Sequence, residues 1–166
     1  MSDLAADATL GLPADKAARY RALLPLVEGL LAGERDLVAN AANLSALLWQ
    51  ALPDCNWIGF YFYKDSGLVV GPFQGKPACV RIALGQGVCG AAAASRRTQL
   101  VRDVHEFPGH IACDAASNAE VVVPLVRGDG SLLGVLDLDS PTVGRFDAAD
   151  AAGLEAIAVR FLASLD

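Results

Sequence analysis

The residues most able to do chemistry in this chain are its four cysteines, and Cys113 has the most polar setting among them. It lies in the loop-like stretch GHIACDAASNAE, with His110 three residues before it and Asp114 directly after it. Cysteines that fill a core sit among apolar side chains, whereas reactive thiols favour partly exposed loops near groups that stabilise a thiolate. Cys113 is therefore a candidate nucleophile, with a packing role as the alternative.

The other three cysteines stand in more apolar surroundings. Cys89, in GQGVCG, lies where a glycine-rich turn runs into a predicted helix, so the positive end of the helix dipole would favour its thiolate. A small residue packed at a tight turn explains Cys89 equally well. Cys79 precedes a short strand-like segment and Cys55 precedes an aromatic one, and both fit core positions.

Metal binding by these cysteines is a lesser alternative. Zinc sites favour short paired spacings such as C-x-x-C, and the gaps of 10 and 24 residues that separate Cys79, Cys89 and Cys113 do not supply them. The two histidines, His105 and His110, keep a mixed cysteine and histidine site open.

A second group of candidates consists of carboxylates. In GVLDLDS, strand alternation places Asp137 and Asp139 side by side on the face opposite two leucines. That face is either solvated or covered, and if it is covered the carboxylates need a shared proton or a cation such as an ammonium. Glu120, at the start of the neighbouring strand, and Asp103, ahead of the Cys113 loop, could join this cluster.

Aromatic residues could form the wall of a pocket beside those carboxylates. Trp57, Gly59 and Tyr61 share one face of a predicted strand. Aromatic residues at alternate strand positions usually belong to the core, but the glycine between them leaves room for something to lie across the sheet. We therefore favour a pocket wall.

The elements that must position these residues follow from periodicity and turn chemistry. Residues 14–52 predict two helices with a break at Gly33, and Pro25 either kinks the first helix or marks its start. Two hairpins follow, with turns at 65–67 and 128–130. Between the hairpins we expect strands near Val80 and Leu100 and a helix over 88–96, and Asp147 is the expected N-cap of a closing helix.

This order of elements predicts an α+β domain, with a central antiparallel sheet flanked by helices. A length of 166 residues fits one domain. We divide it into an N-terminal tail (1–13), a helical part (14–52) and a sheet core with its closing helix (53–166).

Composition narrows the possible partners. A hydrophobic fraction of 54% is that of a folded globule, and a net charge of -6 argues against nucleic acid, which needs clustered Lys and Arg. The sequence lacks a membrane-spanning run and a signal peptide, so we expect a cytoplasmic protein. Thiols there stay reduced unless they are catalytic or sensing.

The motifs GHIACD, GVCG, DVHEFPGH and GVLDLDS together resemble the free methionine-(R)-sulfoxide reductases, which are small GAF-domain enzymes. The resemblance runs from about Lys16 to Leu162. It implies reduction of free L-methionine-(R)-S-oxide to L-methionine, without a bound cofactor and with thioredoxin as the external reductant. It also implies a homodimer.

The resemblance also assigns roles to individual residues. Cys113 would be the nucleophile that becomes a sulfenic acid, and Cys79 and Cys89 would be the recycling cysteines, either of which could meet the sulfenic acid first. The substrate-binding residues would be Trp57, Tyr61, Asp103, Glu120, Asp137 and Asp139. Crowded carboxyl groups would keep one acid protonated for the sulfoxide oxygen.

Three other functions compete with this one. A GAF domain could sense a small molecule or redox state without turnover, although we expect a sensor to carry an output domain. A reductase of protein-bound methionine sulfoxide would gain nothing from an acidic pocket, since a peptide offers no ammonium. A zinc-binding module is the third.

Overall fold

The computed structural model describes residues 10–111 and 113–166, so most of the expected N-terminal tail, residues 1–9, lies outside the described part. One antiparallel sheet has the strand order β3-β2-β1-β6-β5-β4. The strands are β1 (Trp57–Lys64), β2 (Gly67–Gly75), β3 (Arg81–Ala83), β4 (Gln99–Val101), β5 (Ala119–Val126) and β6 (Leu132–Ser140). The helices are α2 (Lys16–Leu31), α3 (Leu37–Ala51), α4 (Gly87–Ser95), α5 (Ala148–Ser164) and the short 3-10 helix η1 (Val104–Glu106).

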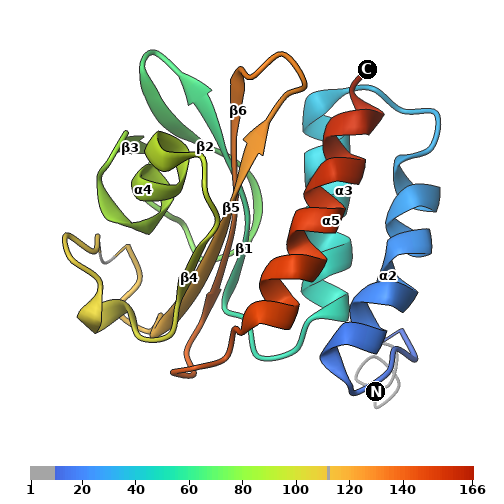
Figure 1. The fold of residues 1–166 in the computed structure, drawn as a ribbon, viewed down its shortest axis with the longest axis horizontal. Coiled ribbons are helices and arrows are strands. Elements are labelled where there is room, and N and C mark those ends of the chain that lie inside the picture. Colours follow the sequence, from blue (N-terminus) through green and yellow to red (C-terminus); the bar gives the residue numbers. More distant parts are fainter. Residues whose placement is uncertain (1–9, 112) are drawn as a thin grey trace.

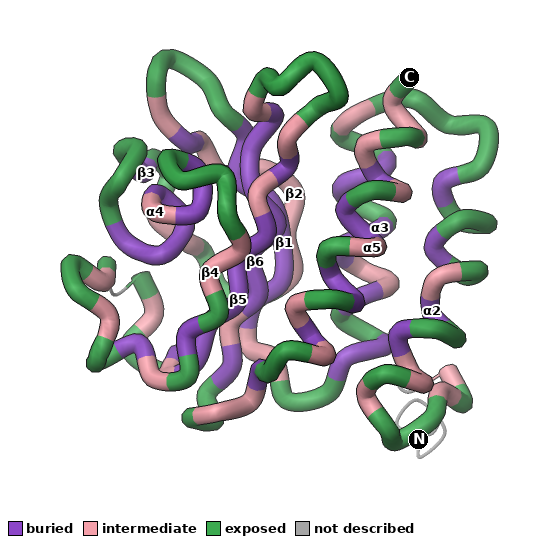
Figure 2. Tube along the Cα trace, in the orientation of Figure 1, coloured by how far each residue is buried: buried purple, intermediate pink, exposed green. Residues whose placement is uncertain are grey.

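The helices cover the two faces of the sheet unequally. Helices α3 and α5 pack against one face with α2 packed on their outer side, and α4 lies on the other face together with the loops that flank it (Figure 1). The expected α+β architecture is confirmed. The thicker helical layer buries the central strands on its side of the sheet, as the burial along β1, β5 and β6 shows (Figure 2).

Strand alternation divides the apolar side chains between two clusters. Ile58, Phe60 and Leu138 point into the cluster beneath α2, α3 and α5. Trp57 and Tyr61 point the other way, into a smaller cluster with Val88 and Cys89 of α4. The faces predicted for β1 and β6 are therefore correct, because a two-residue period fixes them once the strands form.

The hairpin between β1 and β2 closes in two residues. Asp65 and Ser66 have φ values of 52° and 63°, as a tight turn between twisted strands requires, and Gly67 already begins β2. The predicted turn was one residue too long. The hairpin between β5 and β6 turns over 128–130 as expected.

The helix termini follow the predicted capping chemistry. Asp147 caps α5 by accepting hydrogen bonds from the backbone N–H groups of Ala149 and Asp150, and Asp150 reciprocates to complete a capping box. Asp15 caps α2 in the same way, so that helix begins at Lys16. Pro25 lies inside α2, and the alternative that it marks the helix start was wrong.

In the described part of the chain, we find no helix with both the length and the apolar character that crossing a membrane requires.

Candidate active site

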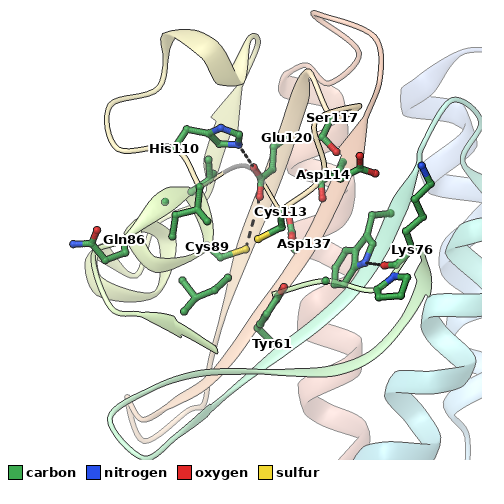
Figure 3. Close-up of a pocket in the computed structure, with 18 residues that line it drawn as sticks. Tyr61, Lys76, Gln86, Cys89, His110, Cys113, Asp114, Ser117, Glu120 and Asp137 are labelled. Atoms are coloured by element: carbon green, nitrogen blue, oxygen red, sulfur yellow. Dashed lines mark hydrogen bonds and ion pairs between the residues drawn. The ribbon is translucent and has the colours of Figure 1, made fainter. Parts of the chain in front are cut away.

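A pocket lies on the α4 side of the sheet, where β1, β5 and β6 meet α4 and two loops (Figure 3). It gathers seven of the nine site residues that the sequence predicts: Trp57, Tyr61, Cys89, Cys113, Glu120, Asp137 and Asp139. Their sequence positions span more than 80 residues, and the antiparallel register brings them together: Asp139 pairs with both Trp57 and Glu120 across the sheet.

A disulfide joins Cys113 at this pocket to Cys79, with 5.7 Å between the two Cα atoms. The candidate nucleophile is thus bonded to one of the two expected recycling thiols, 34 residues earlier in the chain. Cys55 and Cys89 are free thiols. Of the two candidates for the recycling step, Cys79 is the one that reaches Cys113 in this structure.

Cys89 has different surroundings from those that the sequence suggested. Its thiol is buried and donates a hydrogen bond to Oε1 of Glu120, with a sulfur to oxygen distance of 3.7 Å. Burial, and then the negative charges of Asp137 and Glu120, raise the pKa of this thiol well above its usual value. The prediction that the helix dipole favours a thiolate was wrong, because desolvation and two carboxylates outweigh the partial charge of one helix end.

Three carboxyl groups lie together without a matching cation. Burial, followed by repulsion from Asp137, raises the pKa of Glu120 and of Asp139 well above the ordinary range. Burial likewise raises the pKa of Asp137 to about 6. Oδ1 of Asp137 is buried and has no hydrogen-bond partner among the residues described. The cluster therefore holds its protons to a higher pH than exposed carboxyl groups do, as a general acid requires.

His110 is the basic side chain that contacts this cluster. Its Nε2 lies 3.9 Å from Oε2 of Glu120, but burial lowers the pKa of the imidazole and keeps it neutral near pH 7. The sequence marked His110 as a neighbour of Cys113 and as a candidate ligand in a mixed cysteine and histidine metal site. Lys76 also lines the pocket, yet its side chain extends away from the carboxyl groups (Figure 3).

The aromatic wall is held in place by main-chain contacts. Trp57 stacks on Tyr61 and on Phe73, with ring centroids 5.7 and 5.0 Å apart, respectively. The Trp57 indole N–H donates to the carbonyl of Lys76, and the Tyr61 hydroxyl donates to that of Cys79. The tyrosine thus fixes the backbone that carries one half of the disulfide.

From the sequence we expected open space for a ligand beside Gly59. That space is closed in the structure. A side chain at position 59 would collide with Phe73 of β2, which packs directly over the glycine. Gly59 is needed because a bulge in the β1 and β2 pairing brings Phe73 close to the strand. The pocket wall is therefore made by Trp57 and Tyr61, backed by Phe73.

Asp103, which the resemblance assigned to substrate binding, is not among the residues that line the pocket. Its carboxylate caps η1, where it accepts the backbone N–H of His105 at 3.0 Å and lies 2.8 Å from that residue's Nδ1. Those hydrogen bonds lower the pKa of Asp103. In this structure Asp103 shapes the loop before Cys113.

Sequence reasoning missed the segment that closes the pocket from the β2 side. Lys76, Pro77 and Ala78 line it together with Ile82 and Gln86. These residues carry no pattern typical of a site, since they contribute through the position of their backbone.

The chain matches the GAF domain family model over residues 36–160. A free methionine-R-sulfoxide reductase of Escherichia coli is 57% identical over 125 residues, which cover 75% of each chain. The structure of a free methionine-R-sulfoxide reductase from Neisseria meningitidis, in complex with its substrate, is 44% identical, with a TM-score of 0.88 and 92% of each chain covered. A candidate GAF sensor protein from Burkholderia vietnamiensis is 60% identical, with a TM-score of 0.87, covering 90% of this chain and 94% of that one.

Proposed function

Since the chain belongs to the GAF domain family and, within it, to the free methionine-R-sulfoxide reductases, we propose that it reduces free L-methionine-(R)-S-oxide to L-methionine with electrons from thioredoxin. The observation that carries this proposal is the disulfide of Cys79 and Cys113 at a pocket of buried carboxyl groups whose pKa values are raised. Such a pocket offers both a soft nucleophile and an acid, which sulfoxide reduction needs.

The nucleophile is Cys113 in its reduced form. Its thiolate attacks the sulfoxide sulfur while a carboxyl group protonates the oxygen, because an oxide ion cannot leave. The protonated oxygen passes to the sulfur of Cys113 as its bond to the substrate sulfur breaks, methionine departs, and Cys113 is left as a sulfenic acid. Glu120 is the favoured acid, since its pKa is raised by burial and by the charge of Asp137.

The same cluster binds the ammonium of a free amino acid. Asp137 and Asp139 lie on one strand beside Glu120 and are not offset by a charged ion-pair partner in the described residues. An ammonium would supply the missing positive charge in a pocket of low dielectric constant. A methionine sulfoxide within a peptide lacks that group, so we assign the free amino acid as substrate.

The aromatic wall would then meet the S-methyl end of the substrate. Trp57 and Tyr61 present stacked rings to the pocket, and sulfur and methyl groups pack favourably on such rings. The backbone N–H groups of the loop near Ser117 would receive the substrate carboxylate.

The disulfide is the next step in the cycle. The Cys79 thiolate attacks the sulfenic sulfur of Cys113, water leaves, and the disulfide forms. A dithiol of thioredoxin then reduces it, so that one substrate and one reduced thioredoxin become methionine, water and oxidised thioredoxin. Cys89 would serve as a second recycling thiol after opening of its buried site. We further propose that the protein is a homodimer and that it works in the cytoplasm, where a thioredoxin pool is available.

A GAF sensor without turnover is the second candidate, and the likeness to the Burkholderia protein favours it. A sensor would bind its ligand in the same pocket and use the disulfide to report redox state. The two functions differ in whether thioredoxin oxidation continues as long as substrate is present.

The deciding experiment follows thioredoxin-coupled NADPH oxidation with the free R epimer, the free S epimer and an N-acetylated R sulfoxide. We expect turnover with the free R epimer alone, and a loss of at least roughly 10³-fold in Cys113→Ser. Cys55→Ser is the matched control, because that thiol lies outside the pocket. Equal turnover of the N-acetylated compound would overturn the ammonium assignment, and no turnover with any compound would favour the sensor.

A further inference from the structure

We propose that this pocket also binds one divalent cation of borderline softness, such as Zn²⁺, through Cys89, Glu120 and Asp137. The proposed reductase cycle does not use such a site. The inference rests on the convergence of three buried ligand atoms and on an unpartnered oxygen among them.

The three residues present one donor atom each to a common point. A sulfur of Cys89 and one oxygen each of Glu120 and Asp137 all lie within 4.8 Å of one another. Tetrahedral zinc, with bonds of about 2.3 Å to sulfur and about 2.0–2.2 Å to oxygen, places its donors about 3.3–3.7 Å apart. Side-chain shifts of about 1 Å would therefore close the site around an ion.

Asp137 supplies an independent indication that something belongs between these groups. This residue is 4% exposed, and its Oδ1 is buried without a hydrogen-bond partner in the described part of the chain. Buried polar atoms of native proteins are nearly always satisfied, and an orphan indicates an ion or water that completes the site. Figure 3 shows Asp137 and Glu120 converging with Cys89.

The remaining surroundings fit a cation. His110 Nε2 lies 3.9 Å from Oε2 of Glu120, and this imidazole could become the fourth ligand. The cavity in this disulfide form measures about 50 Å³, which leaves room for an ion with a bound water.

Binding requires no oxidation or reduction. The Cys89 thiol releases its proton to solvent as the metal to sulfur bond forms, and the carboxylates bind in their ionised state. The ion would occupy the carboxylates that we assign to the substrate ammonium and would hold Cys89 as a bound thiolate. We infer that such an ion competes with substrate.

The test uses the full chain in its disulfide form, freed of reductant and chelator, so that the sulfurs of Cys79 and Cys113 cannot bind metal. Co²⁺ is titrated while the thiolate-to-cobalt charge-transfer band is followed, and Zn²⁺ binding is measured by calorimetry. We expect one ion per chain, a charge-transfer band that Zn²⁺ displaces, and loss of that band in Cys89→Ser. Asp137→Asn should weaken Zn²⁺ binding at least roughly tenfold, and Cys55→Ser should match the wild type.

A titration without a charge-transfer band, or a band that survives in Cys89→Ser and disappears in Cys55→Ser, would overturn the proposal. Asp137→Asn keeps the test decisive if Cys89→Ser fails to fold, since unchanged Zn²⁺ affinity in that variant also contradicts the site. Reductase turnover is measured separately with chelator present, so failure of metal binding is distinguishable from failure of the proposed function.

Discussion

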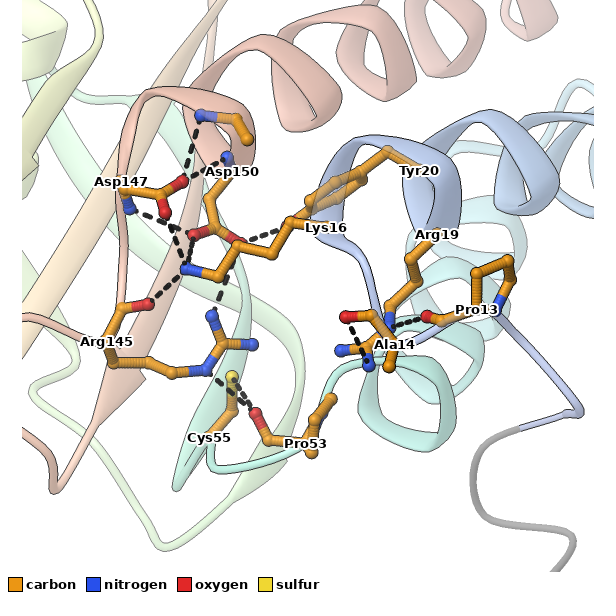
Figure 4. Close-up of polar contacts among 11 residues, drawn as sticks. Pro13, Ala14, Lys16, Arg19, Tyr20, Pro53, Cys55, Arg145, Asp147 and Asp150 are labelled. Carbon is orange, nitrogen blue, oxygen red and sulfur yellow. Dashed lines mark hydrogen bonds and ion pairs between the residues drawn. The ribbon is translucent and has the colours of Figure 1, made fainter.

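In the described part of the chain, buried carboxylates lie on both sides of the sheet, Asp150 on the helical side and Glu120 with Asp137 on the α4 side, and the two sides solve the problem of buried charge in opposite ways. On the helical side, Asp150 accepts hydrogen bonds from Lys16 at 2.6 Å, Tyr20 at 2.9 Å and Arg145 at 3.3 Å (Figure 4). On the α4 side, Glu120 and Asp137 are also buried, and within residues 10–111 and 113–166 they have no lysine or arginine ion-pair partner; a thiol and an imidazole are their neighbours.

The difference separates a structural carboxylate from a functional one. Asp150 needs nothing more, because two cations and a hydroxyl surround its two oxygens, and the arrangement joins α2 to the start of α5. The pocket carboxyl groups lack such partners, so they hold protons or await a cation from outside. The pocket is therefore a region where stability is given up for binding.

The largest effect should come from breaking the compensated cluster. Asp150→Asn leaves Lys16 and Arg145 without their shared anion, and removing one partner of a buried ion pair costs about 3–5 kcal/mol in the free energy of unfolding. Urea unfolding at pH 7 measures this loss. The matched control is Asp147→Asn, which changes an exposed carboxylate of the same cluster and keeps a good N-cap residue. Equal stability of the two variants would contradict a structural role for Asp150.

In the uncompensated cluster, removing a carboxylate should raise the free energy of unfolding instead of lowering it. Burial raises the pKa of Asp137 from 3.8 to about 6, so the unfolded chain releases this proton at lower pH than the folded one. Stability is then fully present below about pH 4 and falls as pH rises through about 6. Asp137→Asn removes that loss, and we expect a gain of about 3 kcal/mol at pH 8, from about 1.4 kcal/mol for each pKa unit.

Urea unfolding of Asp137→Asn at pH 4 and pH 8 checks this prediction. The gain should be nearly absent at pH 4, and substrate affinity should fall. Asp129→Asn is the control, since that carboxylate lies fully exposed in the hairpin turn. A gain of equal size at both pH values would mean that the effect does not come from ionisation.

The pH dependence of turnover gives a smaller effect that identifies the acid. On the alkaline side, methionine formation in a single turnover of the reduced protein should fall about tenfold per pH unit, as the required proton is lost. Glu120→Gln should be slower and lack this decline, because its amide cannot ionise. The titratable groups that line the pocket with Glu120 are Tyr61, Lys76, Cys89, His110, Cys113, Asp114, Asp137 and Asp139. A Glu120→Gln profile parallel to that of the wild type would assign the acid to another of them.

The sequence predicted the pocket better than it predicted the salt-bridge cluster. The reason is that the patterns that indicated the pocket lie within short stretches of sequence, whereas the salt-bridge cluster joins distant ones. Alternation within a strand indicated which face of the sheet carries Asp137 and Asp139. A family resemblance assigned roles to the cysteines. The capping role of Asp147 is also local. Lys16, by contrast, contacts Asp150 across 134 residues, and no local pattern indicates that contact.

Two of the expected site residues have surroundings that the sequence did not indicate, for physical reasons that a sequence does not contain. The state of Cys89 depends on Glu120 and Asp137, which approach it only through the packing of α4 on the sheet. Asp103 lies in a loop, where the direction of a side chain follows from local hydrogen bonds and not from a period.

The smallest effect should come from removing one cation of the compensated cluster. Lys16→Met leaves Arg145 and the Tyr20 hydroxyl on Asp150, and the lysine is partly exposed, so we expect a loss of about 1 kcal/mol in the free energy of unfolding. Because the two clusters lie on opposite faces of the sheet, this loss and the gain from Asp137→Asn should add to within about 0.5 kcal/mol in the double variant. Urea unfolding of both single variants and the double variant at pH 8 measures the sum. A larger deviation would mean that the clusters are coupled through the sheet, and the pocket carboxyl groups could then no longer be treated as independent of the network that anchors α2.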